Sequence, residues 1–119
     1  MRKRTRTIAL MLPLVISACM PAMSVTGMQK REPVLVADSA RDGNAVIACV
    51  SAAWLKLGGA TPKSVPRESG TMLVLGDSFP MLMVETTPTA TGTHVIMHQF
   101  KTMWSDDNRH RVEEVRTCL

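Results

Sequence analysis

Apolar residues between positions 39 and 59 recur with the spacing of an α-helix. They fall at i, i+3, i+4, i+7 and i+11, at Val46, Cys49, Val50, Ala53 and Leu57. This spacing places them along one face of a helix. Ser39 opens a capping-box pattern and Asn44 offers a later N-cap, so the helix is predicted to begin at one of the two. Gly58 and Gly59 supply a strong stop signal.

Short apolar runs divided by turn residues predict strands in the middle of the chain. The best runs are residues 71–75, 81–86 and 93–100. Residues 76–78 and 88–92 between them have the composition of turns. Residues 62–68 are a weaker candidate because Pro66 confines that segment to a sheet edge, and residues 34–37 could add another edge strand. Consecutive strands with short connections pair antiparallel, which predicts a meander of three to four strands.

A second helix is predicted at the end of the chain, from about Asp106 to Cys118. Ser105 can cap it, and the aspartates that follow complement the positive end of the helix dipole. Val112, Val115 and Cys118 share one face of this helix. Two helices packed on one face of an antiparallel meander make a small two-layer α+β domain.

The first 18 residues have the pattern of a secretory signal peptide. Four cations within the first six residues precede an apolar run at residues 8–18, which is shorter than the roughly 20 residues that span a bilayer. Removal of this segment leaves 10 basic and 10 acidic residues, so the mature chain has no formal net charge. Neither its charge nor its few aromatic residues favour nucleic-acid binding.

The end of the apolar run, Ile16-Ser17-Ala18-Cys19, resembles the lipobox of bacterial lipoproteins. The resemblance covers residues 1–19 and implies that Cys19 is lipidated and becomes the first mature residue. Met20, in place of an aspartate, implies an outer-membrane location on the periplasmic side. Residues 19–37 then form the lipidated cysteine and a tether, since they contain proline and glycine and show no sustained period. The folded domain is expected over residues 38–119.

With Cys19 assigned to the lipid, Cys49 and Cys118 remain. An even pair of cysteines in an exported chain indicates a disulfide, which would join the two predicted helices. The alternative is two separate buried thiols. Small domains commonly need such a covalent link, because a core of this size is marginal.

Residues 73–78, a predicted strand that runs into Gly-Asp-Ser, resemble the first block of the GDSL esterases. The resemblance makes Ser78 the nucleophile, and Asp107 and His110 have the spacing of the Asp-x-x-His block. Those enzymes have a parallel α/β sheet in a chain about twice as long, and their Gly and Asn oxyanion blocks are missing here. A small esterase is therefore the remote alternative, and the chain is not expected to be an enzyme.

Methionine and histidine side chains in the strand region suggest a soft-metal site, for which Cu(I) is the natural ion. The candidates are Met81, Met83, His94, Met97 and His98. His94 and His98 would lie about 13 Å apart on one strand, since the rise is about 3.3 Å per residue. Methionine also fills irregular cores. Core filling is the preferred interpretation, so no metal or cofactor is expected.

The remaining candidates for function are contact residues. Arg109, Arg111 and Arg116 lie in a mixed charge run on the last helix, and Trp54 flanks the apolar face of the first. Such a charge run is typical of a solvated face but could contact a partner. We expect a lipid-anchored binding or accessory subunit of a cell-envelope assembly. The alternative within the same class is an inhibitor or immunity lipoprotein against a toxin or hydrolase.

Overall fold

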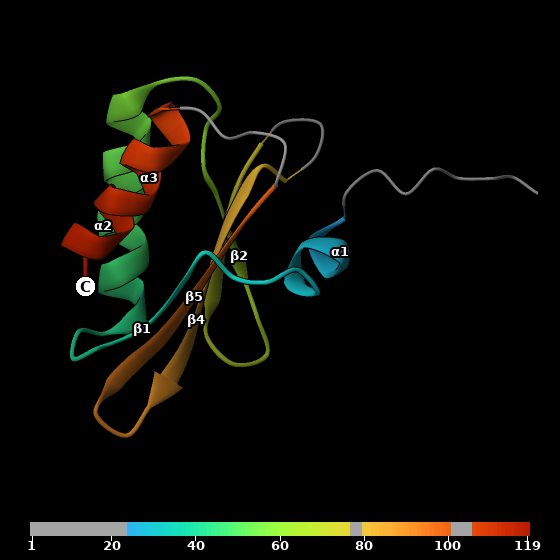
Figure 1. Ribbon diagram of the computed structural model, residues 1–119. Coiled ribbons are helices and arrows are strands. Elements are labelled where there is room, and N and C mark those ends of the chain that lie inside the picture. The colour runs from blue at the N-terminus through green and yellow to red at the C-terminus, as the bar shows by residue number, and fades with distance from the viewer. Residues whose placement is uncertain (1–23, 77–79, 101–105) are drawn as a thin grey trace, which may run out of the picture.

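The computed structural model describes residues 24–76, 80–100 and 106–119, which form an α+β domain (Figure 1). Along the chain the elements are α1 (Val25–Gln29), β1 (Leu35–Ser39), α2 (Gly43–Leu57), β2 (Lys63–Pro66), β3 (Thr71–Leu75), β4 (Leu82–Thr89), β5 (Gly92–Gln99) and α3 (Asp106–Thr117). The predicted fold class is confirmed, although the domain has one more strand and one more helix than expected from the sequence.

The strands make one antiparallel sheet in the order β1-β5-β4-β3-β2. The predicted meander corresponds to β2 to β5. The expectation of three to four strands was too low, because β1 returns to pair with β5 and makes a fifth. Pro66 lies in the edge strand β2, as its missing N–H requires. Pro88 lies in the part of β4 beyond Thr86, the last residue of β4 that pairs with β3. Because β3 does not reach Pro88, no hydrogen bond to β3 is lost through the missing N–H of this proline.

Helices α2 and α3 cover one face of the sheet, and α1 lies on the opposite side (Figure 1). The main core is formed between α2, α3 and the sheet, mostly by branched aliphatic side chains and one tryptophan. Its buried members are Leu35, Val46, Ile47, Val50, Trp54, Leu73, Leu75, Leu82, Val84, Val95, Met97, Val115 and Cys118. We call this side of the sheet the helix face and the opposite side the α1 face.

Helix α2 ends at Gly58, in the left-handed region at φ 77°, as predicted. Its start differs from the expectation, because Asp42 is the N-cap residue. The Ser39 hydroxyl instead accepts from the Arg41 N–H at 3.1 Å and donates to the Leu119 carbonyl at 2.8 Å. These bonds tie the C-terminus to the end of β1.

The disulfide between Cys49 and Cys118 is confirmed. It joins the middle of α2 to the residue that follows α3, with the two Cα atoms 5.7 Å apart and 69 residues apart in sequence. In the chain-entropy model, closing a loop of this length in the unfolded state stabilises the fold by about 4 kcal/mol.

The domain extends into the segment expected to be a tether. Within residues 19–37, five residues form α1, and its Met28 is fully buried against the sheet. Strand β1 also begins before residue 38, at Leu35. The boundary expected at residue 38 is therefore too late, because α1, which packs on the sheet, and the first residues of β1 both precede it. Cys19 and the signal segment lie outside the described residues.

Candidate functional site

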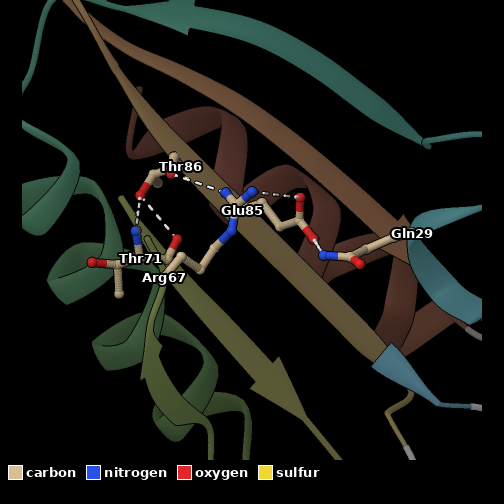
Figure 2. Close-up of polar contacts among 5 residues, drawn as sticks. All are labelled: Gln29, Arg67, Thr71, Glu85 and Thr86. Carbon is tan, nitrogen blue, oxygen red and sulfur yellow. Dashed lines mark hydrogen bonds and ion pairs between the residues drawn. The ribbon is translucent and has the colours of Figure 1, made fainter. Parts of the chain in front are cut away.

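A buried carboxylate on the α1 face anchors α1 to the sheet (Figure 2). The Glu85 side chain, on β4, is only 10% exposed. Its Oε1 accepts a hydrogen bond of 2.6 Å from Nε2 of Gln29, the last residue of α1. Its Oε2 lies 3.7 Å from Nη2 of Arg67. A buried charge needs both a counter-charge and hydrogen bonds, and Glu85 has them.

Arg67 and Thr86 extend this network to Thr71, the first residue of β3 (Figure 2). Nη1 of Arg67 donates to the Thr86 carbonyl at 3.2 Å. The Thr86 hydroxyl donates to the Thr71 carbonyl at 3.0 Å and accepts from the Thr71 N–H at 3.1 Å. A Cβ on Gly70, which has φ +93°, would collide with the Thr86 carbonyl oxygen. These groups satisfy one another, which indicates a structural role for the network.

Three methionines gather beside Glu85 on the α1 face. Met28 from α1, Met72 from β3 and Met83 from β4 form a second buried cluster, separate from the main core. Partly buried apolar side chains surround it, namely those of Val25, Val74 and Phe100. We call Met28, Met72 and Met83 the methionine cluster. They are buried beneath a helix of only five residues.

His98 borders the methionine cluster on β5. It is the register partner of Met83 on the adjacent strand, so the two side chains stand next to each other on the α1 face. His98 is 4% exposed, and its Nδ1 is buried without a hydrogen-bond partner. His94, by contrast, is about one-third exposed and its Nδ1 lies 2.7 Å from Asp38 Oδ1.

The structure thus divides the five residues expected as metal candidates. Met83 and His98 come together, whereas Met97 points into the core on the helix face. Met81 precedes β4 and His94 belongs to the pair with Asp38. The other two members of the methionine cluster, Met28 and Met72, were not predictable from the sequence. Met28 falls in an aperiodic segment and Met72 in a uniformly apolar strand, so neither position carries a pattern that points to the cluster.

A groove between α3 and the start of β1 contains two of the expected contact residues. Its volume is about 420 Å³, and its apolar lining comes from Val34 and Val112. Arg109, Glu113 and Arg116 complete the lining. The Arg116 side chain is 52% exposed, with Nε 3.4 Å from Glu113 Oε1. We call this feature the α3–β1 groove.

Trp54 and Arg111 were candidate partner contacts, and the structure buries both. Trp54 is fully buried, with its indole N–H donating to the Arg111 carbonyl at 3.1 Å. Arg111 is 8% exposed and its Nη2 donates to the Gly58 carbonyl at 2.8 Å. Both residues instead hold α2 and α3 together. Arg111 stands four residues before Val115 and seven before Cys118, a spacing that already places it on the buried side of the helix.

The structure gives no support for a catalytic pair of Ser78 and His110, which the esterase resemblance implies. Ser78 lies outside the described residues, and His110 is exposed on α3. The sheet formed by the described strands is antiparallel throughout, unlike the parallel α/β sheet that the resemblance implies.

No three His, Cys, Asp or Glu side chains in the described ranges lie close enough together to hold a metal ion.

Comparison of the chain with models of known protein families, with curated proteins and with solved structures gave no match. Within the part of the chain that the structure describes, no helix combines the length and the apolar character needed to cross a membrane.

Proposed function

We propose that the chain is a lipid-anchored periplasmic protein of the outer membrane that acts as a binding or accessory subunit of a cell-envelope assembly. The lipobox at residues 16–19 supports the anchor. The disulfide between Cys49 and Cys118 fits export to an oxidising compartment, where such bonds persist. Neither observation names the partner, so the binding surface has to be sought on the domain itself.

The α3–β1 groove is the observation that carries this proposal. Val34 and Val112 give the groove an apolar lining. Arg109, Glu113 and Arg116 complete this lining and leave one excess positive charge. Beside the groove runs β1, which pairs with β5 alone among the described strands. An edge strand offers backbone donors and acceptors to an added strand. A partner segment that is extended, apolar and carries an acidic side chain fits this chemistry.

The lipid would make modest affinity at this groove sufficient. An acylated Cys19 confines the domain to a thin layer next to the membrane, which raises its effective concentration toward other envelope proteins. Four residues separate Cys19 from Ser24, the N-cap of α1, so the domain would work close to the membrane surface.

Site-specific photo-crosslinking in the bacterium that encodes the chain tests the surface. A crosslinker at Arg116 or Val112 should yield one defined adduct with an envelope protein, identified by mass spectrometry. The same crosslinker at Leu55, which is 54% exposed on α2, is the control and should yield none. Equal adducts at all three positions, or none at the groove, would contradict the proposal. A single partner of nanomolar affinity outside any assembly would indicate the inhibitor alternative.

Replacement Cys19→Ser tests the anchor separately. The wild-type chain should be found in the membrane fraction with the mass of an acylated N-terminal cysteine, and the variant should lose both properties. A wild-type chain that begins elsewhere and carries no acyl group would remove the anchor, whatever the outcome of crosslinking.

A further inference from the structure

We propose that the methionine cluster and His98 form a binding site for Cu(I). The ligands would be the thioether sulfurs of Met28 and Met83 and the Nδ1 atom of His98. Met72, on β3, lies two strands away from His98 and would line the site without binding the ion. This inference stands independently of the lipid anchor and of the α3–β1 groove, because it rests only on side chains of the α1 face.

The sulfur donors come from two separate elements that share one buried cluster. Met83 lies on β4, Met28 comes from α1, and Met72 on the neighbouring strand β3 belongs to the same cluster. Met28 and Met83 are fully buried and Met72 is 7% exposed. Methionine has three rotatable bonds, so its sulfur can adjust to a ligand more easily than a branched side chain can.

The nitrogen donor is His98, and its unpaired state is the second, independent observation. Directly opposed side chains on antiparallel strands have Cβ atoms about 4.5–5.5 Å apart, which places the His98 imidazole within reach of the Met83 sulfur. The large majority of buried side-chain polar atoms in proteins have a hydrogen-bond partner. His98 Nδ1 has none. A metal ion would use this lone pair.

The chemistry of the donor set selects the ion. Thioether and imidazole ligands are soft or borderline and carry no charge, which suits Cu(I) better than a hard divalent ion. The two cysteines of the described domain are joined in the disulfide and offer no thiolate. Glu85, the register partner of Met72, places a buried carboxylate beside the cluster. Its negative charge lowers the free-energy cost of burying a monovalent cation there. The two oxygens of Glu85 are contacted by Gln29 at 2.6 Å and by Arg67 at 3.7 Å.

The position of α1 is part of the proposed site. The hydrogen bond between Gln29 and Glu85 fixes the last residue of α1 on the sheet (Figure 2). Met28 is the residue before Gln29, so the same contact holds Met28 in the cluster with Met72 and Met83. Core filling by methionine is the competing explanation, and it predicts the same packing but no affinity for the ion.

Anaerobic titration of the full chain with the tetrakis(acetonitrile) complex of Cu(I) tests the proposal. Competition with bicinchoninate measures the affinity, and no reductant is added, so the disulfide stays intact. We expect one bound Cu(I) per chain and at least ten-fold weaker binding in Met83→Leu and in His98→Leu. The matched controls are Met97→Leu, a buried methionine on the helix face, and His94→Asn, which should bind as the wild type does.

A second measurement does not depend on the folding of any variant. In the wild-type chain with 13C-labelled methionine methyl groups, Ag(I), a redox-inert substitute for Cu(I), should shift the signals of Met28, Met72 and Met83 and leave that of Met97 in place. Absence of binding by the wild type would overturn the proposal. Equal affinity in folded Met83→Leu, His98→Leu and wild type would overturn it too, because the ion would then be bound elsewhere in the chain.

Discussion

The two faces of the sheet are covered in opposite ways. On the helix face, two helices of 15 and 12 residues bury branched aliphatic side chains and are joined by a disulfide. On the α1 face, a helix of five residues covers only part of the sheet, and beneath it lie methionines and a buried carboxylate. Toward β1 this face is open, with Val36 55% exposed.

The helix face therefore stabilises the small domain, whereas the α1 face is able to adapt its packing. Branched side chains have few rotamers and pack in one way, whereas methionine adapts to its neighbours. The helix face therefore determines whether the domain folds. The α1 face, with less buried surface and a short covering element, is the part that can open or take a ligand at low cost.

The largest effect is expected from Trp54→Ala on the helix face. The change removes the largest buried side chain and leaves the Arg111 carbonyl without its donor. We expect a loss of about 5 kcal/mol in the free energy of unfolding, measured by urea denaturation. Leu55→Ala, at an exposed position of the same helix, is the control and should change it by about 0.5 kcal/mol. A small loss in Trp54→Ala would contradict a core centred on this residue.

Removal of the disulfide should come next. The double variant Cys49→Ala with Cys118→Ala should lose about 4 kcal/mol, because the unfolded chain regains the entropy of a loop of 69 residues. Its urea midpoint should match that of the wild type measured in dithiothreitol. An unchanged midpoint would mean that the packing of α2 on α3 suffices without the covalent link.

On the α1 face, Glu85→Ala should cost about 2 kcal/mol, because Gln29 and Arg67 both lose a buried charged partner. Amide hydrogen exchange should accelerate in α1 and remain slow in α2. The matched control is Glu113→Ala, which removes an exposed Arg–Glu pair and should cost less than about 1 kcal/mol. Equal costs at the two glutamates would argue against Glu85 as the anchor of α1.

The smallest effect on stability is expected from Met83→Leu, at about 1 kcal/mol or less, since the side chains have similar volumes. Met97→Leu on the helix face should cost a similar amount. The two variants should differ in Cu(I) affinity alone, which would separate ligand binding from packing on the two faces. A large loss of stability in Met83→Leu, measured by thermal unfolding, would mean that the α1 face is as tightly packed as the helix face.

The elements with a repeating pattern were predictable from the sequence. Strand β3 was predicted with its observed bounds, and α3 to within one residue, because turn residues and a helical period mark their ends. Helix α1 was missed, since five residues are too few to show a period. Its only buried residue is Met28, and nothing in the surrounding segment distinguishes that methionine from Met20 or Met23.

The candidate sites were predictable only in part. Arg109 and Arg116 lie at the surface groove as expected, but the rotation of α2 and α3 about their axes buries Trp54 and Arg111. The spacing of Arg111 from Val115 and Cys118 marks it as inward-facing, but the mixed charge run around it favoured the interpretation of a solvated face. The pairing of Met83 with His98 depends on the register of β4 against β5, which the alternation of residues alone leaves open.

The sequence by itself determined the antiparallel meander, the two long helices and the edge position of Pro66, because these depend on local spacing, turn residues and missing donors. The pairing of Cys49 with Cys118 followed once Cys19 was assigned to a lipid. Tertiary structure alone decided what covers each face of the sheet. Strands such as β3 have apolar side chains on both faces, so the pattern predicts that both faces of the sheet are covered. It does not indicate which element covers the second face. Contact between residues 28 and 83 arises only when the folded chain brings them together.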